Sequence, residues 1–372
     1  MRCYINVVYL SFVLKFNFIG GVYVSLEEMR MKAVVYYGAK DIRLEDVDVP
    51  KIKEGEILIK MRACGVCATD IKTFLKGHPL IKPPNVLGHE VVGDVIDVGS
   101  NVTKFRRGDH VVVAPYVPCN ACYFCRRKAY TLCDYLFREG LVPGGFAEII
   151  KVPASIVEKG TIKIPHHIPY ETATLTEPLA CCIHGIEKCK VRSDDSVAII
   201  GDGPIGLLYL QLIRSMGANK VFICGHHEYR LKIAEDLGAD ITINSGMENP
   251  IKRVMELTEN RGTDITIVCA GSLLAAEQGI RMTRKGGITI LFGGFPSGSV
   301  LEVDPNIIHY SELIVTGSFG FSPDNFRKAF RLIKSGKINA GKIITHKVSL
   351  DEILNVIDLL ASRKCLKAVI IA

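Results

Sequence analysis

"SVAIIGDGPIGLLYLQLIRSMGANKVFICG", residues 196–225, carries the strongest indication of how the chain folds. The apolar run at 196–200 has the length of a strand, and glycines with the spacing G-x-G-x-x-G follow it. Apolar residues then recur with helical period up to Gly217, and a second strand is predicted at 220–224. This order predicts a dinucleotide site whose pyrophosphate lies at the start of the helix. The predicted cofactor-binding residues here are Gly201, Gly203, Pro204, Ile205 and Gly206.

The remaining pattern of this half predicts a parallel sheet. Short apolar runs alternate with helical segments at 241–244, 264–269, 287–292 and 313–317. Strands that alternate with helices form a doubly wound α/β domain, in this case a Rossmann domain over 184–318. Helices near Ser322 and at the capping-box pattern "SLDE" (349–352), with a last strand at 367–372, are expected to return to the first domain.

Length and composition limit the class of protein. The chain has 372 residues, of which 48% are hydrophobic and 23% charged. This length favours two domains, which we place at 31–183, completed by 319–372, and at 184–318. The formal charge of +7 is spread along the chain, and this argues against nucleic acid as a partner. Thirteen cysteines, eight of them without regular spacing, favour a reducing cytoplasm.

The first thirty residues differ from the rest because they are apolar and aromatic, with Lys15 interrupting the run. A signal peptide is one interpretation, but no small-residue cleavage site follows and the run is short for a bilayer. We therefore expect residues 1–30 to be a dispensable extension or the result of a start codon assigned too early. The domain pattern begins at Met31 with a strand, a turn at Gly38 and a second alternating strand.

Four cysteines form the most specific single motif. They are spaced C-x2-C-x2-C-x7-C in "CNACYFCRRKAYTLC", at Cys119, Cys122, Cys125 and Cys133. Four thiolates can close a tetrahedral shell around zinc and leave no position for a substrate, so this site is predicted to be structural. An iron–sulfur cluster is the alternative, although the usual ferredoxin run has a shorter last gap and a following proline.

Catalytic chemistry must then come from other residues. Cys67, Thr69 and Asp70 occur in "CGVCATDIK", His89 and Glu90 begin "HEVVGDVIDVG", and Glu177 lies in "TEPLACCIHG". A thiolate, an imidazole and a carboxylate would leave the fourth position of a zinc ion free. Each residue taken by itself also has an ordinary structural explanation, such as a turn histidine or a glutamate at a helix start.

Together these motifs resemble the medium-chain zinc-dependent alcohol dehydrogenases, in particular the sorbitol and threonine dehydrogenase branch. The similarity runs from about Met31 to the C-terminus and includes G-H-E-x2-G-x5-G, beginning at Gly88, and the four-cysteine lobe. It implies a β-rich, GroES-like catalytic domain beside the Rossmann domain, with two zinc ions per chain. It also implies a homodimer or homotetramer, with no membrane partner.

The resemblance assigns roles residue by residue. Cys67, His89 and Glu177 would surround the catalytic zinc, with Glu177 bound directly or through water. Glu90 would be a nearby exchangeable carboxylate, and Asp70 would orient His89. Thr69 stands where the family places a hydroxyl that passes the alcohol proton toward the cofactor ribose. The usual relay histidine beyond it is replaced by Lys72.

The expected function is hydride transfer between a secondary alcohol, polyol or sugar derivative and a nicotinamide dinucleotide, with a small alcohol or ketone as substrate. The sorbitol branch often has an Arg-Tyr pair where this chain has Phe319, Gly320 and Phe321, which argues against a plain hexitol. Threonine-type amino-alcohol and simple alcohol dehydrogenases are the alternatives within the family. A zinc-stabilised nucleotide-binding protein without turnover and a zinc-finger-like nucleic-acid module are the alternatives from other classes.

The end of the second strand predicts the type of dinucleotide. NAD enzymes usually carry Asp or Glu there to bind the ribose and repel a 2′-phosphate. This chain has Gly225, followed by His226 and His227, which can donate hydrogen bonds, and by Arg230, a cation within reach of a phosphate. The sequence therefore predicts a preference for NADP, with NAD possible as a second cofactor.

Overall fold

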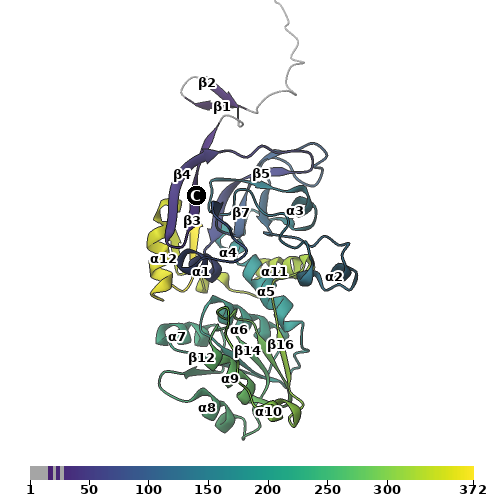
Figure 1. Cartoon of the computed structure of the whole chain (residues 1–372), viewed down its shortest axis with the longest axis vertical. Coiled ribbons are helices and arrows are strands. Elements are labelled where there is room, and N and C mark those ends of the chain that lie inside the picture. Colours follow the sequence, from purple (N-terminus) through teal and green to yellow (C-terminus); the bar gives the residue numbers. More distant parts are fainter. Residues whose placement is uncertain (1–15, 20–21, 26–28) are drawn as a thin grey trace, which may run out of the picture.

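The computed structural model describes residues 16–19, 22–25 and 29–372. The chain forms two parts stacked along its long axis, with helices α5 and α11 where they meet (Figure 1). Most of residues 1–30 lie outside the described residues, so the expectation that they are dispensable stays a prediction. Strands β1 (Phe16–Ile19) and β2 (Val22–Ser25) pair antiparallel, and β3 begins at Arg30, one residue before the predicted start.

The lower part in Figure 1 contains a six-stranded parallel sheet in the order β13-β12-β11-β14-β15-β16. Parallel pairing along this order confirms the doubly wound sheet predicted from the sequence. Its strands are β11 (Ser196–Ile200), β12 (Lys220–Gly225), β13 (Ile241–Asn244), β14 (Thr263–Val268), β15 (Thr283–Leu291) and β16 (Ile314–Gly317).

Helix α6 (Pro204–Met216) follows the first strand, and its sequence explains its ends. Pro204 occupies the first turn, where no intrahelical donor is needed, and Gly217 ends the helix in the left-handed conformation. Its buried face packs into the core between the two parts. The other helices of this domain are α7 (Glu228–Asp236), α8 (Pro250–Leu257), α9 (Leu273–Met282) and α10 (Pro305–His309).

The upper part is rich in β-structure. One sheet has the order β10-β8-β7-β5-β18-β17, with β9 paired to β5, and a second has the order β4-β3-β6. The strands are β3 (Arg30–Gly38), β4 (Asp41–Asp48), β5 (Ile57–Gly65), β6 (Asn85–Val86), β7 (Glu90–Val98), β8 (His110–Val113), β9 (Ile149–Val152), β10 (Thr161–Lys163), β17 (His346–Val348) and β18 (Ala368–Ile371).

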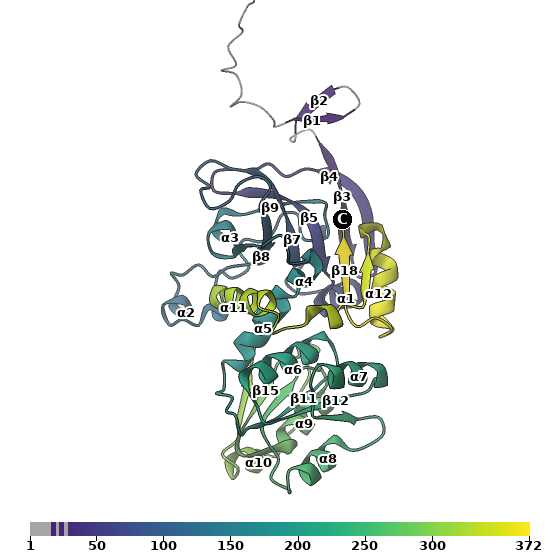
Figure 2. The same ribbon diagram turned by 180° about the vertical axis from the view of Figure 1, so that it is seen from behind.

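The chain end lies in this upper part, because β18 pairs with β5. Figure 2 shows α11 beside α5, and α12 beside β18. The pattern at 349–352 forms a short 3₁₀ turn, Leu350–Glu352, that leads into α12. The helices of this part are α1 (Ala68–Lys76), α2 (Tyr123–Arg126), α3 (Ala154–Lys159), α4 (Tyr170–Thr174), α5 (Thr176–Ile186), α11 (Pro323–Lys334) and α12 (Ile353–Ala361).

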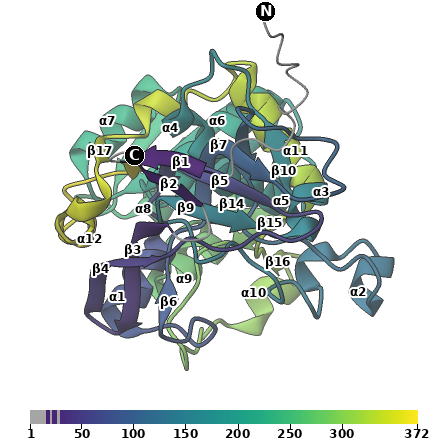
Figure 3. The same ribbon diagram turned by 90° about the horizontal axis from the view of Figure 1, so that it is seen from above.

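The view from above (Figure 3) places α2 and the four-cysteine lobe at the periphery of the molecule. Across the described part of the chain, every cysteine is a free thiol and no helix has the length and apolar character needed to cross a membrane.

Asp264 ties three strands of the parallel sheet together. Its Oδ2 accepts hydrogen bonds from both the backbone nitrogen and the hydroxyl of Ser196 at 2.8 Å. Its Oδ1 accepts one from Nε of Arg284 at 2.6 Å. Burial acts to raise the pKa of Asp264, but Ser196 and Arg284 outweigh it and lower the pKa.

We expect Asp264→Asn to lower the free energy of unfolding by about 2 kcal/mol at pH 7, because charge-assisted hydrogen bonds are lost in a buried position. Since the folded pKa is lowered, the loss should be full above the ordinary value of 3.8 and shrink as the pH falls below it. Urea unfolding measures both effects. Asp236→Asn is the control, because its ion pair with Lys232 is exposed; a similar loss there would contradict the assignment.

Candidate active site

Cys67, His89 and Glu90 form a cluster where β5 and β7 run side by side. Cys67 lies two residues after β5 and caps α1, while Glu90 is the first residue of β7. The pairing of Gly65 with Glu90 fixes these segments relative to each other. One ligand atom from each of the three side chains lies within 4.8 Å of the other two. A thiolate, an imidazole and a carboxylate at this spacing fit a zinc ion and leave a position free.

Asp70 holds the cluster from the first turn of α1. Its Oδ2 accepts a hydrogen bond from the backbone nitrogen of Cys67 at 2.9 Å, and its Oδ1 accepts one from Gly88 at 3.2 Å. The same Oδ1 lies 3.5 Å from Nδ1 of His89. Burial acts to lower the pKa of His89, but Asp70 and Cys67 raise it well above its ordinary value. One carboxylate thus orients both the imidazole and the backbone around it.

Glu90 is paired with Lys367, which the sequence analysis did not include in the site. Lys367 Nζ donates to the Glu90 carboxylate at 2.6 Å and to the carbonyl of Val66 at 3.0 Å. The two side chains are only 4% and 1% exposed. Burial acts to lower the pKa of Lys367, and Glu90 reverses this and raises it. A buried ammonium from the residue just before the last strand therefore balances the charge of Glu90.

Glu177, predicted as the third zinc ligand, lies outside the compact cluster. It is buried in the first turn of α5, with Oε1 3.8 Å from Sγ of Cys181. Burial raises the pKa of Glu177 to about 7, with His89 opposing the rise and Glu90 adding to it. Among the described residues, Glu90 is the carboxylate that completes the cluster. It does so because it adjoins His89 in the chain, whereas Glu177 belongs to another element.

Thr69 and Lys72 lie on α1, next to the cluster. Thr69 is exposed, and its backbone N–H approaches Sγ of Cys67 at 3.5 Å. Lys72 Nζ donates to the carbonyl of Gly294 at 3.4 Å, in the loop after β15. This contact connects the metal-ligand side of the molecule with the parallel-sheet domain.

The four-cysteine lobe surrounds α2, and its sulfur atoms lie within 4.8 Å of one another. Sγ of Cys119 accepts backbone hydrogen bonds from Ala121 at 3.4 Å and Cys122 at 3.3 Å. These bonds lower the pKa of Cys119 to about 6. Cys133 similarly accepts the backbone N–H of Cys119 at 3.3 Å, and Cys125 completes the set. The donor set fits a closed tetrahedral zinc shell.

The glycine-rich turn lies between β11 and α6, at the carboxyl edge of the parallel sheet. Gly203 caps α6, and Pro204, Ile205 and Gly206 form its first turn. The backbone N–H groups of a first helical turn lack intrahelical acceptors, so they can bind a phosphate. Gly201 directly follows β11 and donates its N–H to the carbonyl of Cys224 in the neighbouring strand at 2.8 Å.

Asp202 lies beside Gly225, the last residue of β12. NAD enzymes usually carry an acidic residue at this position. A Cβ on Gly225 would lie 2.5 Å from Cβ and 2.6 Å from Oδ2 of Asp202, so only glycine fits there. Asp202 Oδ2 accepts the backbone N–H groups of His226 and His227 at 2.9 Å and lies 2.9 Å from His227 Nδ1. Burial acts to raise the pKa of Asp202, but these partners lower it. The carboxylate thus fastens the segment after β12 to the glycine-rich turn.

The sequence predicts that the Arg230 guanidinium is available to a phosphate. In the structure it is bound by other protein groups. The side chain is buried, and its NH2 donates to the carbonyls of Arg363 and Cys365, each at 2.9 Å. Nε donates to the hydroxyl of Tyr229 at 2.7 Å, and NH1 lies 3.9 Å from Oδ1 of Asp202. The Arg230 side chain therefore holds the C-terminal segment against α7.

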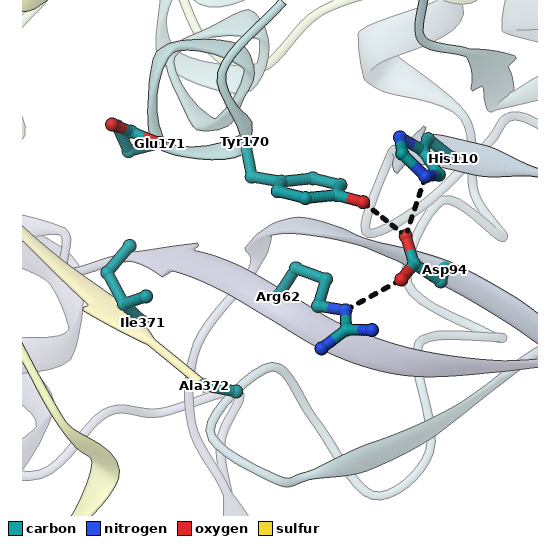
Figure 4. A pocket seen from close by; sticks show the side chains of 7 residues that line it. All are labelled: Arg62, Asp94, His110, Tyr170, Glu171, Ile371 and Ala372. Atoms are coloured by element: carbon teal, nitrogen blue, oxygen red, sulfur yellow. Dashed lines mark hydrogen bonds and ion pairs between the residues drawn. The ribbon is translucent and has the colours of Figure 1, made fainter. Parts of the chain in front are cut away.

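A cavity of about 370 Å³ lies in the upper part near the C-terminus (Figure 4). In it Asp94 accepts hydrogen bonds from Tyr170 and Arg62, each at 2.6 Å, and lies 3.6 Å from His110 Nε2. This network joins β5, β7 and β8 to α4. Because these three side chains already bind the Asp94 carboxylate, we assign no ligand to the cavity.

Two residues of the site were missed from the sequence, although each left a signal. Lys367 is a cation directly before the apolar stretch that forms the buried last strand, and a buried lysine requires a partner. Asp202 is an acid between two glycines of the phosphate-binding motif. Neither indication identifies the partner residue, because the pairs Lys367–Glu90 and Asp202–His227 each join segments that are distant in sequence.

Comparison with known proteins gives the family. Residues 53–165 match the model of the alcohol dehydrogenase GroES-like domain, and residues 204–335 match that of the zinc-binding dehydrogenase. An L-threonine 3-dehydrogenase of Pyrococcus abyssi is 37% identical, over 85% of this chain and 90% of that protein. A sorbitol dehydrogenase of Bacillus subtilis is 30% identical, over 91% of this chain and 97% of that protein.

A solved structure from the same kind of enzyme is also similar to this chain. It is a zinc-binding dehydrogenase of Sinorhizobium meliloti bound to NADP, with 31% identity and a TM-score of 0.86, covering 93% of this chain and all of that one. The chain therefore belongs to the medium-chain zinc-dependent alcohol dehydrogenase family, and it is an oxidoreductase of the alcohol dehydrogenase type.

Proposed function

We propose that the chain interconverts a secondary alcohol, polyol or sugar derivative and its carbonyl compound, with a nicotinamide dinucleotide as the hydride partner. The observation that supports this most directly is the Cys67, His89 and Glu90 cluster, whose ligand atoms lie within 4.8 Å of one another. A nucleotide-binding protein without turnover would have no use for an open donor set of this kind. The relatives named above act as threonine and sorbitol dehydrogenases.

The proposed roles follow from position. Cys67, His89 and a carboxylate would hold the catalytic zinc, which supplies a Lewis acid that makes an alcohol easier to deprotonate. Glu177 and Glu90 are the two carboxylates available for this site, and Asp70 keeps His89 in orientation. Thr69 would pass the alcohol proton toward the ribose, with Lys72 at the outer end of the path.

The four-cysteine lobe would hold a second zinc ion with a structural role. We also propose a cytoplasmic location, because the described cysteines are free thiols. A homodimer or homotetramer is the proposed assembly, and light scattering would determine it.

We expect two zinc ions per chain by elemental analysis. Cys67→Ala should lose one ion and reduce turnover at least a thousandfold, because the open site loses its thiolate, while the melting temperature falls little. Cys122→Ser should lose the other ion and destabilise the fold. Cys189→Ser is the matched control, since this cysteine belongs to neither group. One zinc in the wild type, or an active Cys67→Ala protein, would contradict the proposal.

We further propose NADP as the preferred dinucleotide. The end of β12 presents Gly225, and the Asp202 carboxylate beside it already accepts two backbone N–H groups and faces His227 and Arg230. An oxygen so occupied is a poor acceptor for ribose hydroxyls, and its charge is balanced by neighbours. The exposed His226 is the side chain that could donate to a 2′-phosphate.

The ratio of kcat/KM with NADP and with NAD tests this preference, and we expect it to exceed ten. Asp202→Ala should weaken both cofactors by similar factors, because the segment after β12 loses its anchor. A loss confined to NAD would show instead that Asp202 binds the ribose. The variant Gly225→Asp is unsuitable as a test because its Cβ would collide with Asp202.

A further inference from the structure

Four aromatic side chains form a continuous row, which we call the aromatic wall: Tyr116, Phe137, Phe319 and Phe321. Tyr116 stacks on Phe321 with ring centroids 4.9 Å apart. Phe137 meets Tyr116 edge-on at 5.1 Å and Phe319 at 6.1 Å. Two segments far apart in sequence build this row, one flanking the cysteine lobe and one following β16.

The wall lies beside α5, the helix that carries Glu177. A Cβ added to Gly185 of α5 would lie 3.2 Å from Oγ of Ser318, the residue before Phe319. Cys181 lies one turn earlier on this helix, and its sulfur is 3.8 Å from Oε1 of Glu177. Burial raises the pKa of the Tyr116 phenol, and Cys181 and Glu177 raise it further. The wall therefore lies next to the helix that carries Glu177, and the Tyr116 phenol is within electrostatic reach of that carboxylate.

Phe319, at one end of the row, lies at the edge of the dinucleotide domain. Phe319 comes two residues after the end of β16, which is parallel to β11 and the other strands. The carboxyl ends of parallel strands share one edge, and ligands of such sheets bind outside it. A Cβ on Gly320 would lie 2.9 Å from the Tyr116 hydroxyl, so glycine allows the two segments to approach.

The exposure of the rings indicates what they contact. Phe321 is 2% exposed and forms the base of the wall, whereas Phe137 and Phe319 are 51% and 58% exposed. Adjacent exposed phenyl groups beside a site mark a surface for an apolar ligand. The four side chains offer no cation for a carboxylate, and their one hydroxyl cannot satisfy a row of polyol hydroxyls.

We infer that the substrate is a secondary alcohol, or its ketone, that carries an apolar substituent of aryl size, and that this substituent packs on the aromatic wall. The inference rests on the proposed dehydrogenase function and narrows it. Phe319 and Phe137 would then be the residues that determine specificity, while the metal-ligand set stays common to all substrates.

The first test compares kcat/KM for 1-phenylethanol, 2-propanol, sorbitol and L-threonine. We expect 1-phenylethanol to be the best of the four. Phe319→Ala should lower its kcat/KM about three- to tenfold, the range for loss of one aromatic contact, and change 2-propanol less than twofold. Tyr123→Ala is the control, because this exposed ring contacts Phe124 and Arg127 rather than the wall.

The second test measures binding without turnover. The chain has no tryptophan, so the fluorescence anisotropy of a naphthyl alcohol can be followed without an indole background. Binding should weaken three- to tenfold in Phe319→Ala and stay unchanged in Tyr123→Ala. Turnover of sorbitol or threonine above 1-phenylethanol, or equal binding to all variants, would overturn the inference and leave the proposed function intact. If the naphthyl alcohol binds through the wall but no alcohol is oxidised, the proposed function fails instead.

Discussion

The buried ion pair between Lys367 and Glu90 is the constraint around which the upper part is organised. A buried charge without a partner costs several kcal/mol, so each of these side chains requires the other. Lys367 immediately precedes β18, and Glu90 begins β7, while β5 lies between the two strands and pairs with both. The pair therefore fixes three strands in register and brings the end of the chain to the metal-ligand cluster.

The same C-terminal segment connects the two parts of the molecule. Arg230 of α7 donates to the carbonyls of Arg363 and Cys365, just before Lys367 reaches Glu90. On its other side Arg230 faces Asp202, which holds the residues after β12. A run of about five residues thus contacts both the dinucleotide side and the metal-ligand side. Movement of one domain relative to the other must strain or break these contacts, and this supports a defined distance between the glycine-rich turn and the cluster.

The fold could be read from the sequence because its signals are local. The strand at 196–200 and the helix that ends before Gly217 follow from apolar spacing and a glycine cap, and the structure has both. The position of Arg230 could not be predicted in this way. Its side chain lies near Asp202, as a cation at a nucleotide site would, but its donors are taken by carbonyls more than a hundred residues later. Local sequence shows which groups are charged, whereas tertiary packing determines which partners they use.

The metal-ligand cluster and the aromatic wall are carried by different kinds of structural element. Cys67, His89 and Glu90 lie at the ends of paired strands and at a helix cap, where a shift of one residue would destroy the site. Tyr116, Phe137 and Phe319 lie in connecting segments outside the helices and strands, and such segments can change without loss of the fold. Relatives at 30–37% identity can therefore share the metal-ligand geometry and differ in substrate. For this reason the substrate has to be inferred from the rings of the aromatic wall, and not from the activities of the relatives.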